Sequence, residues 1–68
     1  MKTGKAYTFN YDGITFMFTI IDNYCECYAE SQYQFGFDLG QLGHVETPED
    51  IRELLIVNYD NGNIFIDE

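Results

Sequence analysis

The stretch YTFNYDGITFMFTI, residues 7–20, decides the fold, because two alternating runs flank the dipeptide Asp12-Gly13. Asp-Gly between such runs is the signal of a two-residue β-hairpin turn. A turn at this position places Phe9 opposite Phe16 and gathers the large apolar side chains of both strands on one face. The sequence therefore predicts an antiparallel hairpin with one core-facing side.

The next run, YCECYAES at residues 24–31, also alternates, and it follows a second turn signal, Asp22-Asn23. This turn pairs Phe18 with Cys27, so both cysteines of the run fill space on the core face beside larger neighbours. The opposite face of the same strand is expected to be half exposed, and it carries Tyr24, Glu26, Tyr28 and Glu30.

A fourth alternating run spans residues 33–39 and extends the meander, with Gly36 suggesting a β-bulge. We expect a three-residue loop over residues 31–33 before this run. A two-residue turn would place Phe35 on the wrong face of the sheet.

The sequence TPED at residues 47–50 predicts the start of a helix, with Thr as N-cap, Pro at the first position and acids in the first turn. An apolar stripe within residues 51–55 can cover one face of the sheet. We favour a helix near 48–57 that ends at about Asn58. The alternative is a terminal hairpin that pairs residues 55–59 with residues 64–67.

In either case we expect a final strand over residues 64–66. The predicted fold class is α+β: an antiparallel β-meander of about four strands, one short helix near 48-57, and a C-terminal strand. Residues 1–68 are expected to form a single acidic domain with a thin core, because a chain of this length buries a limited share of its surface.

Charge is the most unusual property of the chain. Twelve Asp and Glu stand against three Lys and Arg, for a formal net charge of −9, and Arg52 is the only Lys or Arg after Lys5. The negative electrostatic potential that this net charge creates disfavours direct binding to nucleic acid or to an anionic membrane and favours a basic protein partner. Without a long apolar run or a secretion signal, we expect a cytoplasmic protein with reduced cysteines.

Metal and catalytic chemistry have little support in the sequence. Cys25, Cys27 and His44 are three soft ligands, but Cys-x-Cys is not the usual zinc spacing, and a Cys–His nucleophile pair has no supporting motif. The stretch DNGNIFIDE, residues 60–68, lacks the spacing of a calcium loop, and no glycine-rich phosphate loop is present. We predict a protein without cofactors that is not an enzyme.

The acids instead suggest a binding surface. Carboxylates repeated on a rigid strand and helix can take the place of the phosphates of a nucleic acid and bind the Lys and Arg side chains of a nucleic-acid-binding groove. Tyrosines beside them supply contact area at low entropic cost. The candidate partner-binding residues are Tyr24, Glu26, Tyr28, Glu30, Glu46, Glu49, Asp50 and Glu53.

In size, acidity and tyrosine content the chain resembles the small phage-encoded inhibitors of bacterial defence, in particular anti-CRISPR proteins that act as DNA mimics. The resemblance is one of class and covers the whole chain. It implies that the protein occupies the DNA-binding or PAM-reading groove of an effector complex in the bacterial host cell, without catalysis. The resemblance does not specify the CRISPR type, and it leaves a restriction enzyme or a glycosylase open as the target.

Three alternatives remain open at this point. An immunity protein or antitoxin that blocks a basic nuclease would use the same physics. A structural or adaptor protein would form a β-sheet oligomer through the face that carries Met17, Tyr24 and Tyr28, so that both monomer and homodimer are open. An enzyme would require a cleft that joins His44 to Cys25 or to two carboxylates.

Overall fold

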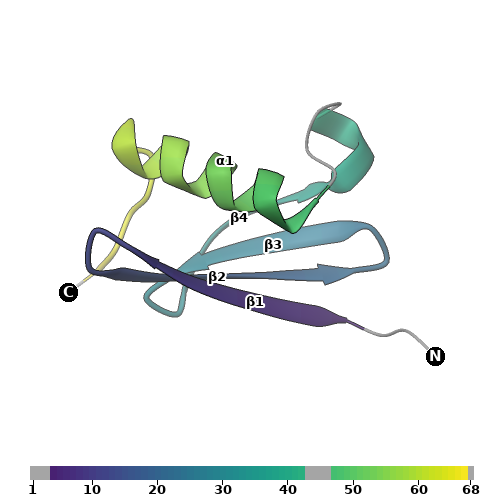
Figure 1. Cartoon of the computed structure of the whole chain (residues 1–68), viewed down its shortest axis with the longest axis horizontal. Helices are drawn as coiled ribbons and strands as arrows, with labels where there is room; N and C mark the ends of the chain where they lie inside the picture. Colours follow the sequence, from purple (N-terminus) through teal and green to yellow (C-terminus); the bar gives the residue numbers. More distant parts are fainter. Residues whose placement is uncertain (1–3, 43–46, 68) are drawn as a thin grey trace.

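Four antiparallel strands form a sheet in which spatial order follows sequence order, β1-β2-β3-β4 (Figure 1). The computed structural model describes residues 4–42 and 47–67. The strands are β1 (Lys5–Tyr11), β2 (Ile14–Ile21), β3 (Tyr24–Ala29) and β4 (Gln32–Asp38). A short 3₁₀ helix, η1 (Leu39–Leu42), and one α-helix, α1 (Pro48–Asp60), follow. The predicted α+β class is therefore confirmed.

The first two hairpins have the predicted registers. Phe9 pairs with Phe16 across the first turn, and Phe18 pairs with Cys27 across the second. Asp12 and Gly13 have φ angles of 54° and 78°, and the residues of the second turn are also left-handed. Two left-handed central residues match the right-handed twist of the strands, which explains why Asp, Asn and Gly occupy these turns.

The third hairpin corrects the sequence interpretation. Its turn contains two residues, Glu30 and Ser31, with φ angles of 50° and 67°, so the expected three-residue loop is wrong. The register then shifts within the hairpin, because Tyr28 pairs with Tyr33 whereas Cys27 pairs with Phe35. The extra residue of this bulge is Gln34, which is two positions before the glycine expected to mark it. The bulge returns Phe35 to the core face and so resolves the conflict that had suggested a longer loop.

The core lies between the sheet and α1. Buried side chains on the inner face of the sheet meet two helix side chains, Ile51 and Leu55, that are fully buried. Stacked rings on β1 and β2 extend this layer, with centroids 5.0 Å apart for Tyr7 and Phe18. The buried residues of the sheet are Phe16, Phe18, Cys25, Cys27 and Ala29. The expected packing of large β2 side chains against small β3 side chains is confirmed.

Helix α1 begins as predicted and ends later. The Asp50 N–H donates to the Thr47 hydroxyl, and the Asp50 carboxylate accepts from the Thr47 N–H, which is a capping box. The apolar stripe continues through Tyr59, whose ring meets Phe16 edge-on at 5.8 Å. The helix therefore continues past Asn58 to Asp60, and the alternative terminal hairpin does not form.

The expected C-terminal strand is not formed, since residues 63–67 have no regular secondary structure. Two glutamine side chains of β4 hold this segment instead. The Gln34 amide donates to the Phe65 carbonyl at 2.7 Å and accepts from the Phe65 N–H at 2.9 Å. Gln32 makes the same pair of bonds with Asp67, both at 2.9 Å. Side-chain amides thus satisfy backbone groups that a strand partner would otherwise satisfy.

Candidate partner-binding surface

The sheet has an inner face that α1 covers and an outer face on which no described element packs (Figure 1). Strand register assigns the side chains of the outer face. They are Ala6, Thr8 and Asn10 of β1, Thr15, Met17, Thr19 and Ile21 of β2, Tyr24, Glu26 and Tyr28 of β3, and Tyr33 and Asp38 of β4. This described set contains two carboxylates and no Lys, Arg or His.

Three tyrosines of the outer face gather around Gly36, and we call Tyr24, Tyr28 and Tyr33 the tyrosine cluster. The rings of Tyr28 and Tyr33 meet edge-on, with centroids 5.7 Å apart. A β-carbon on Gly36 would lie 2.5 Å from the Tyr24 hydroxyl and 3.0 Å from the Tyr33 hydroxyl, so both phenols converge above this glycine. Glu26 pairs with Gly36 across the strands and therefore lies among the three rings.

The tyrosine cluster is only partly shielded from water. Tyr24 is 42% exposed and Tyr33 is 54% exposed. Partial desolvation raises the pKa of the Tyr33 phenol, and the neighbouring Tyr24 hydroxyl and the negative charge of Glu26 add to this effect. The sequence predicted that Tyr24, Glu26 and Tyr28 share a face, and the registers confirm it. Tyr33 was missed, because its place beside Tyr28 depends on the two-residue turn.

Glu30 has a structural task at the edge of this surface. It lies in the β3–β4 turn, where its backbone N–H donates to the Thr15 carbonyl at 2.8 Å. Its carboxylate accepts from the Thr15 N–H at 2.7 Å. These bonds extend the pairing of β2 and β3 by one position. Glu30 was expected to continue the strand on the same face as Glu26, but it lies in the turn after β3.

The helix acids lie on the other side of the molecule. Glu49 and Glu53 are exposed on α1, which packs on the inner face, so the structure does not bring them together with Glu26. Asp50 belongs to the capping box at the start of the helix. Glu46 lies outside the described residues. The candidate acids therefore form two separate surfaces.

A reciprocal tyrosine–aspartate arrangement links the first turn to the end of α1, and sequence reasoning missed it. The Tyr59 hydroxyl donates to Asp12 at 2.7 Å, and the Tyr11 hydroxyl donates to Asp60 at 3.2 Å. The two rings meet edge-on at 5.8 Å. The hydrogen bond to Asp12 raises the pKa of Tyr59, and the bond to Asp60 raises the pKa of Tyr11. These two acids therefore have structural roles.

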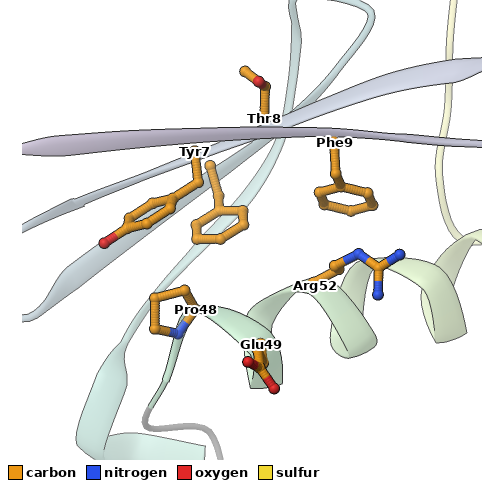
Figure 2. Close-up of a pocket in the computed structure, with 7 residues that line it drawn as sticks. Tyr7, Thr8, Phe9, Pro48, Glu49 and Arg52 are labelled. Carbon is orange, nitrogen blue, oxygen red and sulfur yellow. The ribbon is translucent and has the colours of Figure 1, made fainter.

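A small pocket of about 150 Å³ lies between β1 and α1. Figure 2 shows Tyr7 and Phe9 facing Pro48 and Arg52 across it, while Thr8 points to the other side of β1. The Arg52 guanidinium carbon is 5.4 Å from the centre of the Phe9 ring, a cation–π contact. The lining is largely apolar, and its geometry suits packing between strand and helix.

The two thiols are buried and adjacent, with 3.8 Å between the sulfurs of Cys25 and Cys27. The contact between them lowers the pKa of Cys25 and, together with burial, raises that of Cys27. Within residues 4–42 and 47–67, no three His, Cys, Asp or Glu side chains are placed to hold a metal ion. His44, the third soft ligand considered from the sequence, lies outside these residues.

No protein-family model matches the chain, and comparisons with curated proteins and with solved structures found no significant match. Among the helices described, none is long and apolar enough to cross a membrane.

Proposed function

We propose that the protein is a non-catalytic inhibitor that binds the basic, nucleic-acid-binding surface of another protein. The observation that carries this proposal is the outer face, where Glu26 lies among three tyrosines. Both described cations are elsewhere: Arg52 is on α1, and Lys5 has the same strand parity as the inner-face residues Tyr7 and Phe9. The face thus combines aromatic contact area with negative charge that no cation among residues 4–42 and 47–67 offsets on the same face.

The charge of the whole chain supports the same function. With twelve acids and three Lys and Arg, at most three acids can be paired one to one, which leaves nine carboxylates in excess. Such a field accelerates encounter with a cationic groove and loses strength as salt rises. Tight binding needs an aromatic centre that becomes desolvated in the complex, and the half-exposed tyrosine cluster would become one when a partner covers it. In this proposal the protein acts as a DNA mimic, and Glu49 and Glu53 on α1 contribute to the field.

Capture from bacterial lysate tests the proposal, with the immobilised protein at low and at high salt. We expect a nucleic-acid-binding protein that salt releases and that duplex DNA displaces. Glu26→Lys and Glu53→Lys change the net charge equally but on opposite faces, so they form a matched pair. We expect Glu26→Lys to abolish capture and Glu53→Lys to weaken it modestly, with circular dichroism showing that both variants fold.

Two outcomes would contradict this function. Equal capture by both variants and the parent would show that the outer face is not the binding surface. Capture of further copies of the same chain alone, insensitive to salt, would indicate a β-sheet oligomer instead. The exposed Ile21 beside Tyr24 is the observation that favours such an oligomer, but self-association would bring like charges on Glu26 and Asp38 together.

A further inference from the structure

The tyrosine cluster has the composition of a site for a cation. The negative faces of aromatic rings attract cationic groups within about 6 Å of the ring centre. Tyr24 and Tyr33 reach the same point above Gly36 from neighbouring strands, and Tyr28 stands beside them. Glu26 adds a formal negative charge among the rings. A cation bound here would meet π-faces and a carboxylate at once.

No described cation of the chain itself is placed to fill this site. Arg52 is held over the Phe9 ring on the far side of the sheet. Lys5 pairs with Ile20 and therefore belongs to the inner-face positions of β1, not to the outer face. The charge of Glu26 is therefore available to a cation from another molecule.

We infer that the tyrosine cluster, together with Glu26, binds the guanidinium of one arginine side chain from a protein partner. The inference rests on the proposed function for the source of that arginine. Arginine fits better than lysine, because its planar, weakly hydrated head group stacks on aromatic rings and can also donate to a carboxylate. A second copy of the chain is a poorer occupant, because its own net charge of −9 opposes approach.

Nuclear magnetic resonance on the intact chain tests this site without the partner. The probe is an end-blocked peptide, Gly-Gly-Arg-Gly-Gly, compared with the same peptide containing citrulline, which keeps the shape and loses the charge. We expect shifts localised at Glu26, Gly36 and the tyrosine rings, and roughly tenfold weaker binding of the citrulline peptide. Equal binding of both peptides, or shifts spread over all the acids, would overturn the inference.

Matched variants distinguish binding at the tyrosine cluster from a nonspecific effect of the net negative charge. Glu26→Gln should weaken the arginine peptide several-fold, whereas Glu53→Gln on α1, with the same loss of charge, should leave its affinity nearly unchanged. Gly36→Ala should also weaken binding, because the added methyl occupies the space below the Tyr24 and Tyr33 hydroxyls. Gly40→Ala meets no atom within 4 Å and is the control for the substitution itself.

Ring and hydroxyl contributions are separated at position 33. Tyr33→Phe keeps the π-face and should retain most of the binding, whereas Tyr33→Leu should lose it, with the amide spectrum reporting that both fold. Loss of binding in Tyr33→Phe as well would show that the hydroxyl is required and would contradict a site in which the ring face of Tyr33 holds the guanidinium.

The failure of this inference is distinguishable from the failure of the proposed function. Localised peptide binding with no DNA-displaceable partner in lysate would support the arginine site and contradict the inhibitor function. Partner capture that survives Tyr33→Leu and Glu26→Gln would support the inhibitor function and overturn the arginine site.

Discussion

Replacing Gln34 by leucine should loosen the C-terminal segment at Phe65, although Gln32 and the core packing of Ile64 and Ile66 still hold its other residues. The Gln34 amide makes two bonds to Phe65, at 2.7 and 2.9 Å, and Gln32 makes two more to Asp67. A hydrogen bond of this kind contributes about 0.5–1.5 kcal/mol net, and exposed bonds lie at the low end. Gln34→Leu should therefore lower the free energy of unfolding by about 1–2 kcal/mol, a large share for a chain whose total is of the order of 3–10 kcal/mol.

Urea denaturation followed by tyrosine fluorescence measures this loss, and thermal unfolding should show a decrease in Tm of about 5–15 °C. Amide hydrogen exchange locates it, because the N–H of Phe65 should lose protection while the N–H groups of β2 keep theirs relative to the global stability. Gln34→Glu is the matched control. It keeps the acceptor for the Phe65 N–H, loses the donor to the Phe65 carbonyl and adds one negative charge, so the Phe65 N–H should keep more protection than in Gln34→Leu.

A double variant tests whether the two glutamines act on the same segment. Both hold one segment, so the double variant with leucine at positions 32 and 34 should lose less stability than the sum of the single losses. An unchanged unfolding midpoint for Gln34→Leu, with unchanged exchange at Phe65, would show that the amide bonds do not hold the C-terminal segment in solution.

Three further predictions concern the core and the first turn. Leu55→Ala removes a fully buried side chain and should cost about 2–5 kcal/mol in urea denaturation, whereas Val57→Ala, at an exposed position of the same helix, should cost far less. Cys25 and Cys27 should not react with a thiol reagent in the native state and should react on unfolding, and native reactivity would contradict their burial. The bond to Asp12 raises the pKa of Tyr59 above 10.0, so folding keeps this phenol protonated where the unfolded chain ionises. Its contribution to stability is thus full below pH 10 and is lost as the pH rises through the folded pKa, and Tyr59→Phe should flatten the fall in stability measured above pH 10.

The first two hairpins could be read from the sequence because turn chemistry and alternation agree there. Asp12-Gly13 specifies a two-residue turn, and the same register gathers Phe9 and Phe16 on one face. The third hairpin could not, because a two-residue turn and the position of Phe35 were in conflict. The conflict disappears with a bulge at Gln34, which also bonds to Phe65, a residue far away in the sequence. Gly36 suggested a bulge in this strand, but nothing local placed the extra residue at Gln34.

The structure of the C-terminal segment, residues 63–67, could not be predicted from the sequence either. Ile64, Phe65 and Ile66 have strong β-propensity, yet the Gln34 amide bonds the backbone of Phe65 in place of a strand ladder, and Ile64 and Ile66 pack against the core. Propensity favours an extended backbone but does not say what satisfies its polar groups. The separation of the helix acids from Glu26 was, by contrast, within reach of the sequence. The apolar stripe of α1 had to cover the face with the large side chains, which is the face opposite Glu26.

The two halves of the outer face differ in composition. Its β1–β2 half carries mainly small polar residues such as Thr8, Asn10 and Thr15, which is ordinary for a solvated strand surface. The β3–β4 half carries three tyrosines and two carboxylates on the same sheet.

β-Propensity treats threonine and tyrosine alike, so it does not explain why one half is small and polar and the other is aromatic and acidic. Half-exposed tyrosines also contribute little to the core. Replacing both Tyr24 and Tyr33 by threonine removes two of the three rings and makes the β3–β4 half more like the β1–β2 half. If the aromatic half exists for a partner, this variant should fold with near-parent stability in urea and lose DNA-displaceable capture, whereas a large loss of stability would assign the tyrosines to folding.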